Sequence, residues 1–132
     1  MTNDEAILMK SPGGKGEREF DLAERTARFG EEAIRFARSV KLDAITSPLV
    51  RQFVRSATSI GANYCEADES GSKKEFRYRI SICVRETRET KHWLRMLAQA
   101  HPQGAPQSHL LWKEADELSR IFATIHRRSA PK

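Results

Sequence analysis

Apolar residues recur every three or four positions in four stretches of this sequence, and no stretch alternates apolar with polar residues. Steps of three and four place side chains on one face of an α-helix, whereas alternation is typical of a β-strand. The sequence therefore predicts an all-α fold built from four amphipathic helices. The predicted helices run from about Asp21 to Lys41, from Ser47 to about Ser70, from Lys73 to about Ala100 and from about His109 to Arg127.

Signals at the helix ends support this division. Pro48 follows a serine, which indicates an N-cap and then a proline in the first turn, where a missing N–H costs nothing. Glu75 lies three residues after another serine, which is the spacing of a capping box. Residues 101–106 contain two prolines and a glycine, which together cannot continue a helix. The predicted N-caps are Ser47, Ser72 and Ser108. Because the connections are short, we expect an up-down-up-down four-helix bundle.

The chain length fits one domain. A chain of 132 residues can bury one core, and 39% hydrophobic residues are too many for a disordered chain. We predict a flexible N-terminal arm over residues 1–19, the bundle over residues 20–128 and a flexible tail over residues 129–132. Charges interrupt every apolar stretch, so we expect no membrane span and a cytoplasmic location. Cys65 and Cys83 lack metal-ligand spacing and are predicted to be buried free thiols.

The excess positive charge is concentrated in the third predicted helix. Lys and Arg total 23 against 18 Asp and Glu, and residues 73–97 hold eight basic and three acidic residues. Basic residues at helical spacing form a stripe opposite the core side of this helix, and arginines on such a face can bind nucleic-acid phosphates. The predicted nucleic-acid-binding residues are Lys74, Arg77, Arg85, Arg88, His92 and Arg95. The alternative is a solvated face, or one that pairs with carboxylates of a neighbouring subunit.

A third sector lies between the core stripe and the basic stripe of the same helix. The predicted core stripe comprises Phe76, Ile80, Cys83, Thr87, Thr90, Leu94 and Leu97. The third sector holds large side chains that a single bundle would expose, together with two glutamates that could pair with arginines of a partner. The predicted oligomer-interface residues are Tyr78, Ile82, Glu86, Glu89, Trp93 and Met96. The alternative is that a rotation of the helix buries them in a broad core.

Motifs for catalysis are absent from the sequence. The histidines form no metal-binding pair, no serine or cysteine lies in a nucleophile motif, and neither a metal nor another cofactor is expected. Glu66, Asp68 and Glu69 cluster near the end of the second helix, where carboxylates could hold a divalent ion for a nuclease. A solvated helix end is the simpler interpretation, so the sequence predicts a protein that is not an enzyme.

The segment from Val54 to Ala67, VRSATSIGANYCEA, resembles the R-x-A-x-S-I-x-x-N-x-x-E motif of bacterial four helix bundle proteins, also called 23S rRNA-intervening sequence proteins. Residues 72–76, SKKEF, are similar to the S-x-x-E-F opening of that family's third helix, and residues 86–94 resemble its following E-x-x-x-x-L stretch. The likeness covers residues 20–127. This chain has Tyr64-Cys65 and Ala67 where the family usually has Ile-Ala and Gly.

The resemblance implies a four-helix bundle without a catalytic centre that assembles into a ring, commonly a homopentamer. A relative, the accessory variability determinant of diversity-generating retroelements, suggests binding to RNA, DNA and a reverse transcriptase through a basic outer surface. The predicted function is therefore a non-enzymatic homo-oligomer that binds a nucleic-acid backbone, with a reverse transcriptase as a second partner that the resemblance suggests. The alternative is a structural or adaptor protein that binds another protein.

Overall fold

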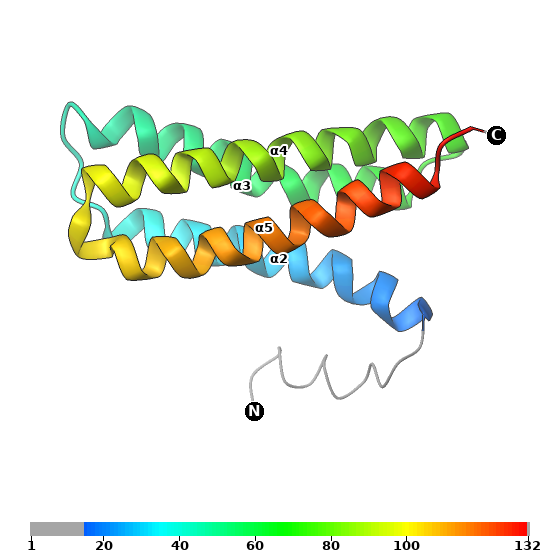
Figure 1. The fold of residues 1–132 in the computed structure, drawn as a ribbon, viewed down its shortest axis with the longest axis horizontal. Coiled ribbons are helices and arrows are strands. Elements are labelled where there is room, and N and C mark those ends of the chain that lie inside the picture. The colour runs from blue at the N-terminus through cyan, green and yellow to red at the C-terminus, as the bar shows by residue number, and fades with distance from the viewer. Residues whose placement is uncertain (1–14, 132) are drawn as a thin grey trace.

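The computed structural model describes residues 15–131, which form four α-helices and one short 3-10 turn and contain no strand (Figure 1). The elements are α2 (Lys15–Ser39), α3 (Thr46–Asp68), α4 (Lys73–Ala100), the turn η1 (Pro102–Gly104) and α5 (Ala105–Arg128). The predicted all-α class is therefore confirmed. Residues 1–14 of the predicted arm and residue 132 of the predicted tail lie outside the described residues, and α2 begins at Lys15 rather than near Asp21.

The helices pack in the order of the sequence. The contacts of α4 with α3 and with α5 are the most extensive, whereas α2 packs mainly on α3 and meets α5 over a shorter stretch. The α2–α3 and α4–α5 connections lie at one end of the bundle, and the α3–α4 turn and the end of α5 lie at the other (Figure 1). This arrangement is consistent with an up-down-up-down bundle, and α4 packs against both α3 and α5.

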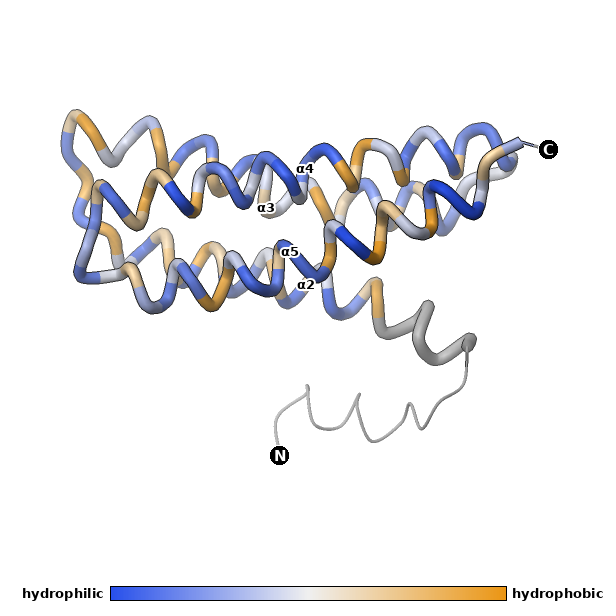
Figure 2. The backbone as a smooth tube through the Cα atoms, viewed as in Figure 1, coloured by the Kyte–Doolittle hydropathy of each residue, from blue (hydrophilic) through white to orange (hydrophobic). Residues whose placement is uncertain are grey.

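The apolar stripes predicted from the sequence form the core. Apolar and polar residues interleave along each helix, as amphipathic helices require (Figure 2). The predicted core stripe of α4 is buried along its length, except that Phe76 is partly exposed and packs against the core from its edge. The largest fully buried side chains are Phe53 of α3 and Phe122 of α5. Removing this apolar surface from water is the main force that holds the helices together.

The start of α3 is capped by a residue that the sequence analysis missed. The Asp43 carboxylate oxygen Oδ1 accepts hydrogen bonds from the backbone N–H groups of Ile45 and Thr46, each at 2.8 Å. The Thr46 hydroxyl in turn accepts from the Asp43 backbone N–H at 2.9 Å. The prediction that Ser47 is the N-cap is therefore wrong. α3 already begins at Thr46, and the Asp43 carboxylate accepts from the backbone N–H of this first residue.

The predicted cap of the last helix is also wrong. α5 begins at Ala105, three residues before Ser108, and the Ser108 side chain is buried. Its hydroxyl donates to the backbone carbonyl oxygen of Leu94 on α4 at 2.7 Å. This serine therefore joins two helices instead of starting one. Ser72 is confirmed as the N-cap of α4, because its hydroxyl accepts from the Glu75 backbone N–H at 3.1 Å.

The two cysteines lie in different environments. Cys83 is buried in the core, and its Sγ lies 3.6 Å from the carbonyl oxygen of Ile60. Cys65 is exposed, so the prediction of two buried thiols is wrong for this residue. Cys65 lies beside the apolar stripe of α3, on a side that the neighbouring helices do not cover. Burial raises the pKa of the Cys83 thiol to about 12.

We expect one thiol to react with a disulfide reagent in the folded protein at pH 8, and two in denaturant. Only a thiolate is nucleophilic, and Cys83 is both shielded and protonated at this pH. The measurement is a timed thiol count with and without guanidinium chloride. The variant Cys65→Ser is the control, and it should show no fast-reacting thiol. Two fast-reacting thiols in the native wild type would contradict the burial of Cys83.

Candidate nucleic-acid interface

The solvent-facing side of α4 carries most of the predicted basic stripe. α4 is one unbroken helix from Lys73 to Ala100, so residues three and four apart share a side. We define the exposed stripe as the residues of the predicted set that are exposed in the structure. These are Lys74, Arg85, Arg88, His92 and Arg95. Within the described part of the chain, the Lys and Arg residues of the exposed stripe form no ion pair.

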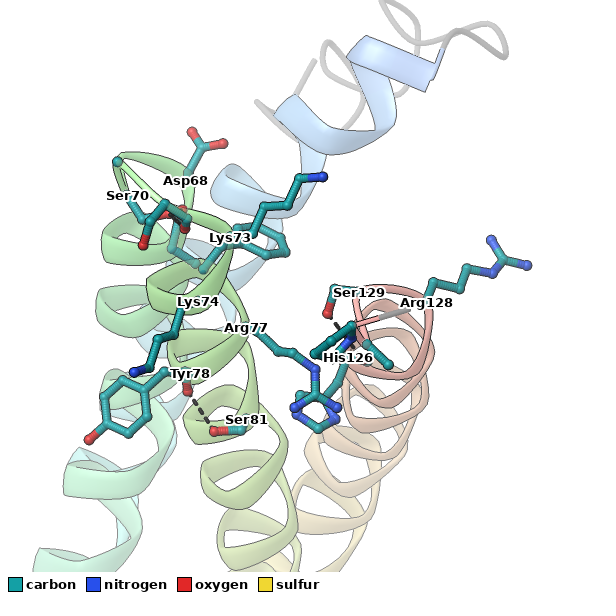
Figure 3. Close-up of a pocket in the computed structure, with 16 residues that line it drawn as sticks. Asp68, Ser70, Lys73, Lys74, Arg77, Tyr78, Ser81, His126, Arg128 and Ser129 are labelled. Atoms are coloured by element: carbon teal, nitrogen blue, oxygen red, sulfur yellow. Dashed lines mark hydrogen bonds between the residues drawn. The ribbon is translucent and has the colours of Figure 1, made fainter.

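Arg77 does not belong to the exposed stripe. It is partly buried and its side chain extends from α4 toward α5, where the guanidinium lies beside the ring of His126 (Figure 3). The helical spacing of Arg77 from Lys74 and Ser81 predicted that it lies on the stripe. In the structure, the last turns of α5 cover this side of the first turns of α4. The expected position of Arg77 on an exposed face is therefore corrected, because this residue lies between two helices. Its binding to nucleic acid stays a prediction.

Two further basic residues of α4 are paired within the chain. Arg79 donates to Glu75 at 2.9 Å, and Lys91 donates to Asp116 of α5 at 2.8 Å. The hydrogen bond from Lys91, and then the charges of Lys91 and Arg120, lower the pKa of Asp116. The positive charge that α4 offers to a ligand is therefore smaller than its composition suggests, and it is concentrated in the exposed stripe.

The predicted interface sector turns out to be divided between the α3–α4 contact and the surface. Ile82 and Glu86 are buried, and Trp93 packs against the core, while Met96 is partly buried and Tyr78 is exposed. Burial of Ile82 and Glu86 within one chain agrees with the alternative interpretation for these two positions. The oligomer interface itself stays a prediction.

The two glutamates of this sector bind an arginine of their own chain. Arg55 of α3 donates through Nη1 to Glu86 at 3.0 Å and through Nη2 to Glu89. The Trp93 indole also donates to Glu89, at 3.2 Å. Partial burial raises the pKa of Glu89, but the hydrogen bonds from Arg55 and Trp93 outweigh it, so the pKa lies below its usual value. These carboxylates therefore need no arginine from a partner.

The motif that carries the family resemblance lies along the same contact between α3 and α4. Its Asn63 accepts from Arg79 of α4 at 3.3 Å and donates to the carbonyl oxygen of Ser59 at 2.9 Å. Its Arg55 forms the pairs with the two glutamates, and its Ala57 is fully buried. The motif alone predicts no structural role for these residues. The signal that could have found it is the helical register that Arg55 and Asn63 share with the polar residues of α4.

The three acidic residues that could serve a nuclease do not form a metal-binding cluster in the described structure. Glu66, Asp68 and Glu69 are all exposed. Among the described residues, no three His, Cys, Asp or Glu side chains gather closely enough to hold a metal ion. The helices of the described part also include none that is long and apolar enough to cross a membrane.

Comparison with known proteins assigns this chain to a family. The model of the 23S rRNA-intervening sequence protein family matches residues 18–124, which is most of the sequence. The chain belongs to this family. A crystal structure of an S23 ribosomal protein family member of unknown function from Bacteroides thetaiotaomicron is similar, with a TM-score of 0.71 at 21% identity over 83% of this chain and 97% of that chain. At this identity the likeness shows the fold. Comparison with curated proteins found no match.

Proposed function

We propose that this 23S rRNA-intervening sequence protein is not an enzyme and binds the sugar-phosphate backbone of RNA or DNA through the exposed stripe of α4. The observation that carries the proposal is a row of Lys and Arg side chains on one continuous helix that have no carboxylate partner in the described residues. Lys74 and Arg95 are 21 residues apart, which on a helix is about 30 Å. This length is close to one helical turn of duplex DNA, about 34 Å.

The chemistry of the exposed stripe favours backbone contacts over reading of the bases. Its residues are Lys, Arg and one His, with Tyr78 as an exposed aromatic side chain beside Lys74. Base-specific binding usually adds asparagine or glutamine pairs to adenine, or several aromatic rings that stack on bases. We therefore expect little dependence on nucleotide sequence and a steep loss of affinity with salt.

Self-assembly is part of the proposal. Family membership supports it, and several copies would add their exposed stripes and raise the overall affinity for a long nucleic acid. A reverse transcriptase is the protein partner that the sequence resemblance suggests. If the wild-type chain bound no nucleic acid at low salt, the alternative of a structural or adaptor protein would take the place of this proposal.

The decisive test replaces three arginines of the exposed stripe with glutamine. In the variant R85Q/R88Q/R95Q we expect the affinity for RNA or DNA to fall by about tenfold to a hundredfold at low salt, because three phosphate contacts are lost. The slope of log affinity against log salt should become less steep by about three. Gel shift or fluorescence anisotropy across a salt series measures both quantities.

The matched control removes three exposed arginines from other helices. The variant R38Q/R51Q/R127Q has the same formal charge as R85Q/R88Q/R95Q, since each falls from +5 to +2. It should keep most of the affinity and most of the salt slope. Equal losses in the two variants would mean that net charge alone drives binding, and no loss in the first would remove the exposed stripe from the proposal.

A further inference from the structure

A groove lies at the end of the bundle where the α3–α4 turn, the first turns of α4 and the last turns of α5 meet (Figure 3). We call this depression the end groove. Arg77 and His126 face each other across it, and Lys73 and Arg128 extend toward solvent from its two sides (Figure 3). Among the described residues, the charged lining consists of Lys73, Lys74, Arg77, Arg128 and one carboxylate, that of Asp68. Four cationic side chains against one acidic side chain make the groove attractive to anions.

Arg77 differs from every comparable cation in the described part of the chain. The partly buried Lys and Arg residues there are Arg25, Arg28, Arg77, Arg79 and Lys91. The other four each bind a carboxylate, as Arg25 binds Glu114 of α5 at 2.7 Å. Arg77 forms no ion pair with a described residue, and its Nε is buried without a hydrogen-bond partner. A buried guanidinium N–H without an acceptor is costly, so this position calls for an anionic oxygen.

His126 supplies a second group that an anion could engage. Burial and the positive charge of Arg77 lower the pKa of His126, so its ring is neutral at pH 7. Lys73 and Lys74 of α4 and Arg128 of α5 add positive charge to the groove around it, and Asp68 of α3 adds a negative charge. A bound anion would reverse the effect of these cations and favour the protonated ring, which can then donate a hydrogen bond.

We propose that the end groove binds a phosphate monoester group, held by the Arg77 guanidinium and by protonated His126. A monoester carries a charge of about −1.5 to −2 at pH 7 and three acceptor oxygens. A phosphodiester inside a nucleic-acid chain carries one charge, whereas Arg77 and a protonated His126 together match the two charges of a monoester. The ligand is therefore a terminal phosphate or a small phosphate ester. This site is separate from the arginines of the exposed stripe, because α5 covers Arg77, and Lys74 alone belongs to both.

Inorganic phosphate is the first probe. The pKa of His126 is followed by NMR in the full chain at constant ionic strength, with chloride as the reference anion and H126Q to assign the signal. Phosphate should raise this pKa and the shift should saturate. In the variant R77Q the response to phosphate should be lost, whereas R51Q on α3, with the same change in charge, should respond like the wild type. Thermal melting checks that R77Q is folded, and R77K is the replacement variant if it is not.

An absent or non-saturating response in the wild type would overturn the proposal, as would an equal response in wild type and R77Q. A loss in R51Q as large as in R77Q would also overturn it, because the effect would then be one of net charge. The wild-type titration decides by itself even if neither variant at position 77 folds.

Short oligonucleotides of one sequence, with a 5′-phosphate or a 5′-hydroxyl, identify the source of the phosphate. A several-fold preference for the phosphorylated form that disappears in R77Q supports a nucleic-acid terminus as the ligand. Saturation by inorganic phosphate without this preference supports a small phosphate ester in the same groove. The variant R85Q/R88Q/R95Q should weaken both oligonucleotides equally, so failure of the exposed stripe and failure of the end groove give different results.

Discussion

Replacing Phe122 with alanine is expected to lower the free energy of unfolding by about 3–5 kcal/mol. Phe122 of α5 is fully buried, and its ring centroid lies 5.8 Å from that of Tyr64 on α3. The substitution removes a large apolar side chain from the contact between helices and leaves a cavity that the surrounding helices can only partly close. Urea denaturation followed by circular dichroism measures the change.

The control for Phe122→Ala is Leu110→Ala on the same helix. Leu110 is 60% exposed, so this variant should change the stability by less than about 0.5 kcal/mol. The measurements should be repeated at several protein concentrations, because assembly would add its own stabilisation to the wild type. If Phe122→Ala cost less than about 1 kcal/mol, the packing of α5 on α3 and α4 would be wrong.

Replacing Arg55 with methionine is expected to cost about 2–3 kcal/mol. The side chain of Glu86 is 6% exposed, and Arg55 is its ion-pair partner in the described residues. Without the guanidinium, a carboxylate stays buried between α3 and α4 with no counterion. The expected cost is below that of a fully buried pair because the Arg55 side chain is itself 45% exposed. Chemical denaturation at pH 7 measures the change.

A second substitution separates the loss of charge from the loss of packing. In the variant R55M/E86Q the buried carboxylate becomes a neutral amide, so about 1–2 kcal/mol of the loss should return. Replacing Glu89 instead, as R55M/E89Q, should recover less, because Glu89 is more exposed than Glu86. Equal recovery in the two double variants would mean that burial of Glu86 does not govern the cost.

These stability predictions bear on function through α4. The α3–α4 contact fixes the rotation of α4, and this rotation decides which of its basic residues reach solvent. Arg55, Glu86 and Glu89 hold one side of the helix, while Lys91 and Asp116 hold the other. The buried apolar face fixes most of this rotation, and loss of either ion-pair contact is expected to leave the exposed stripe less well aligned. The variant R55M is therefore also expected to weaken nucleic-acid binding, although Arg55 lies outside the exposed stripe.

Much of the fold could be predicted from the sequence because the helices are long and strongly amphipathic. The bounds of α4 and its core stripe follow from the spacing of Ile80, Leu94 and Leu97 and from the cap at Ser72. Periodicity of this kind depends only on residue spacing, so no knowledge of neighbouring helices was needed. The exposed stripe was predictable for the same reason, since Arg85, Arg88 and Arg95 lie opposite the buried positions.

Only the tertiary structure decided the surroundings of residues at the edge of a helical stripe. Ser108 has the residue type of a cap but bonds to α4, Arg77 has the spacing of the exposed stripe but lies against α5, and Cys65 has the spacing of the core but is exposed. The repeat of a helix gives the direction of each side chain within its own helix. It does not give the rotation of one helix against the next, which is fixed when all four helices bury their apolar faces together.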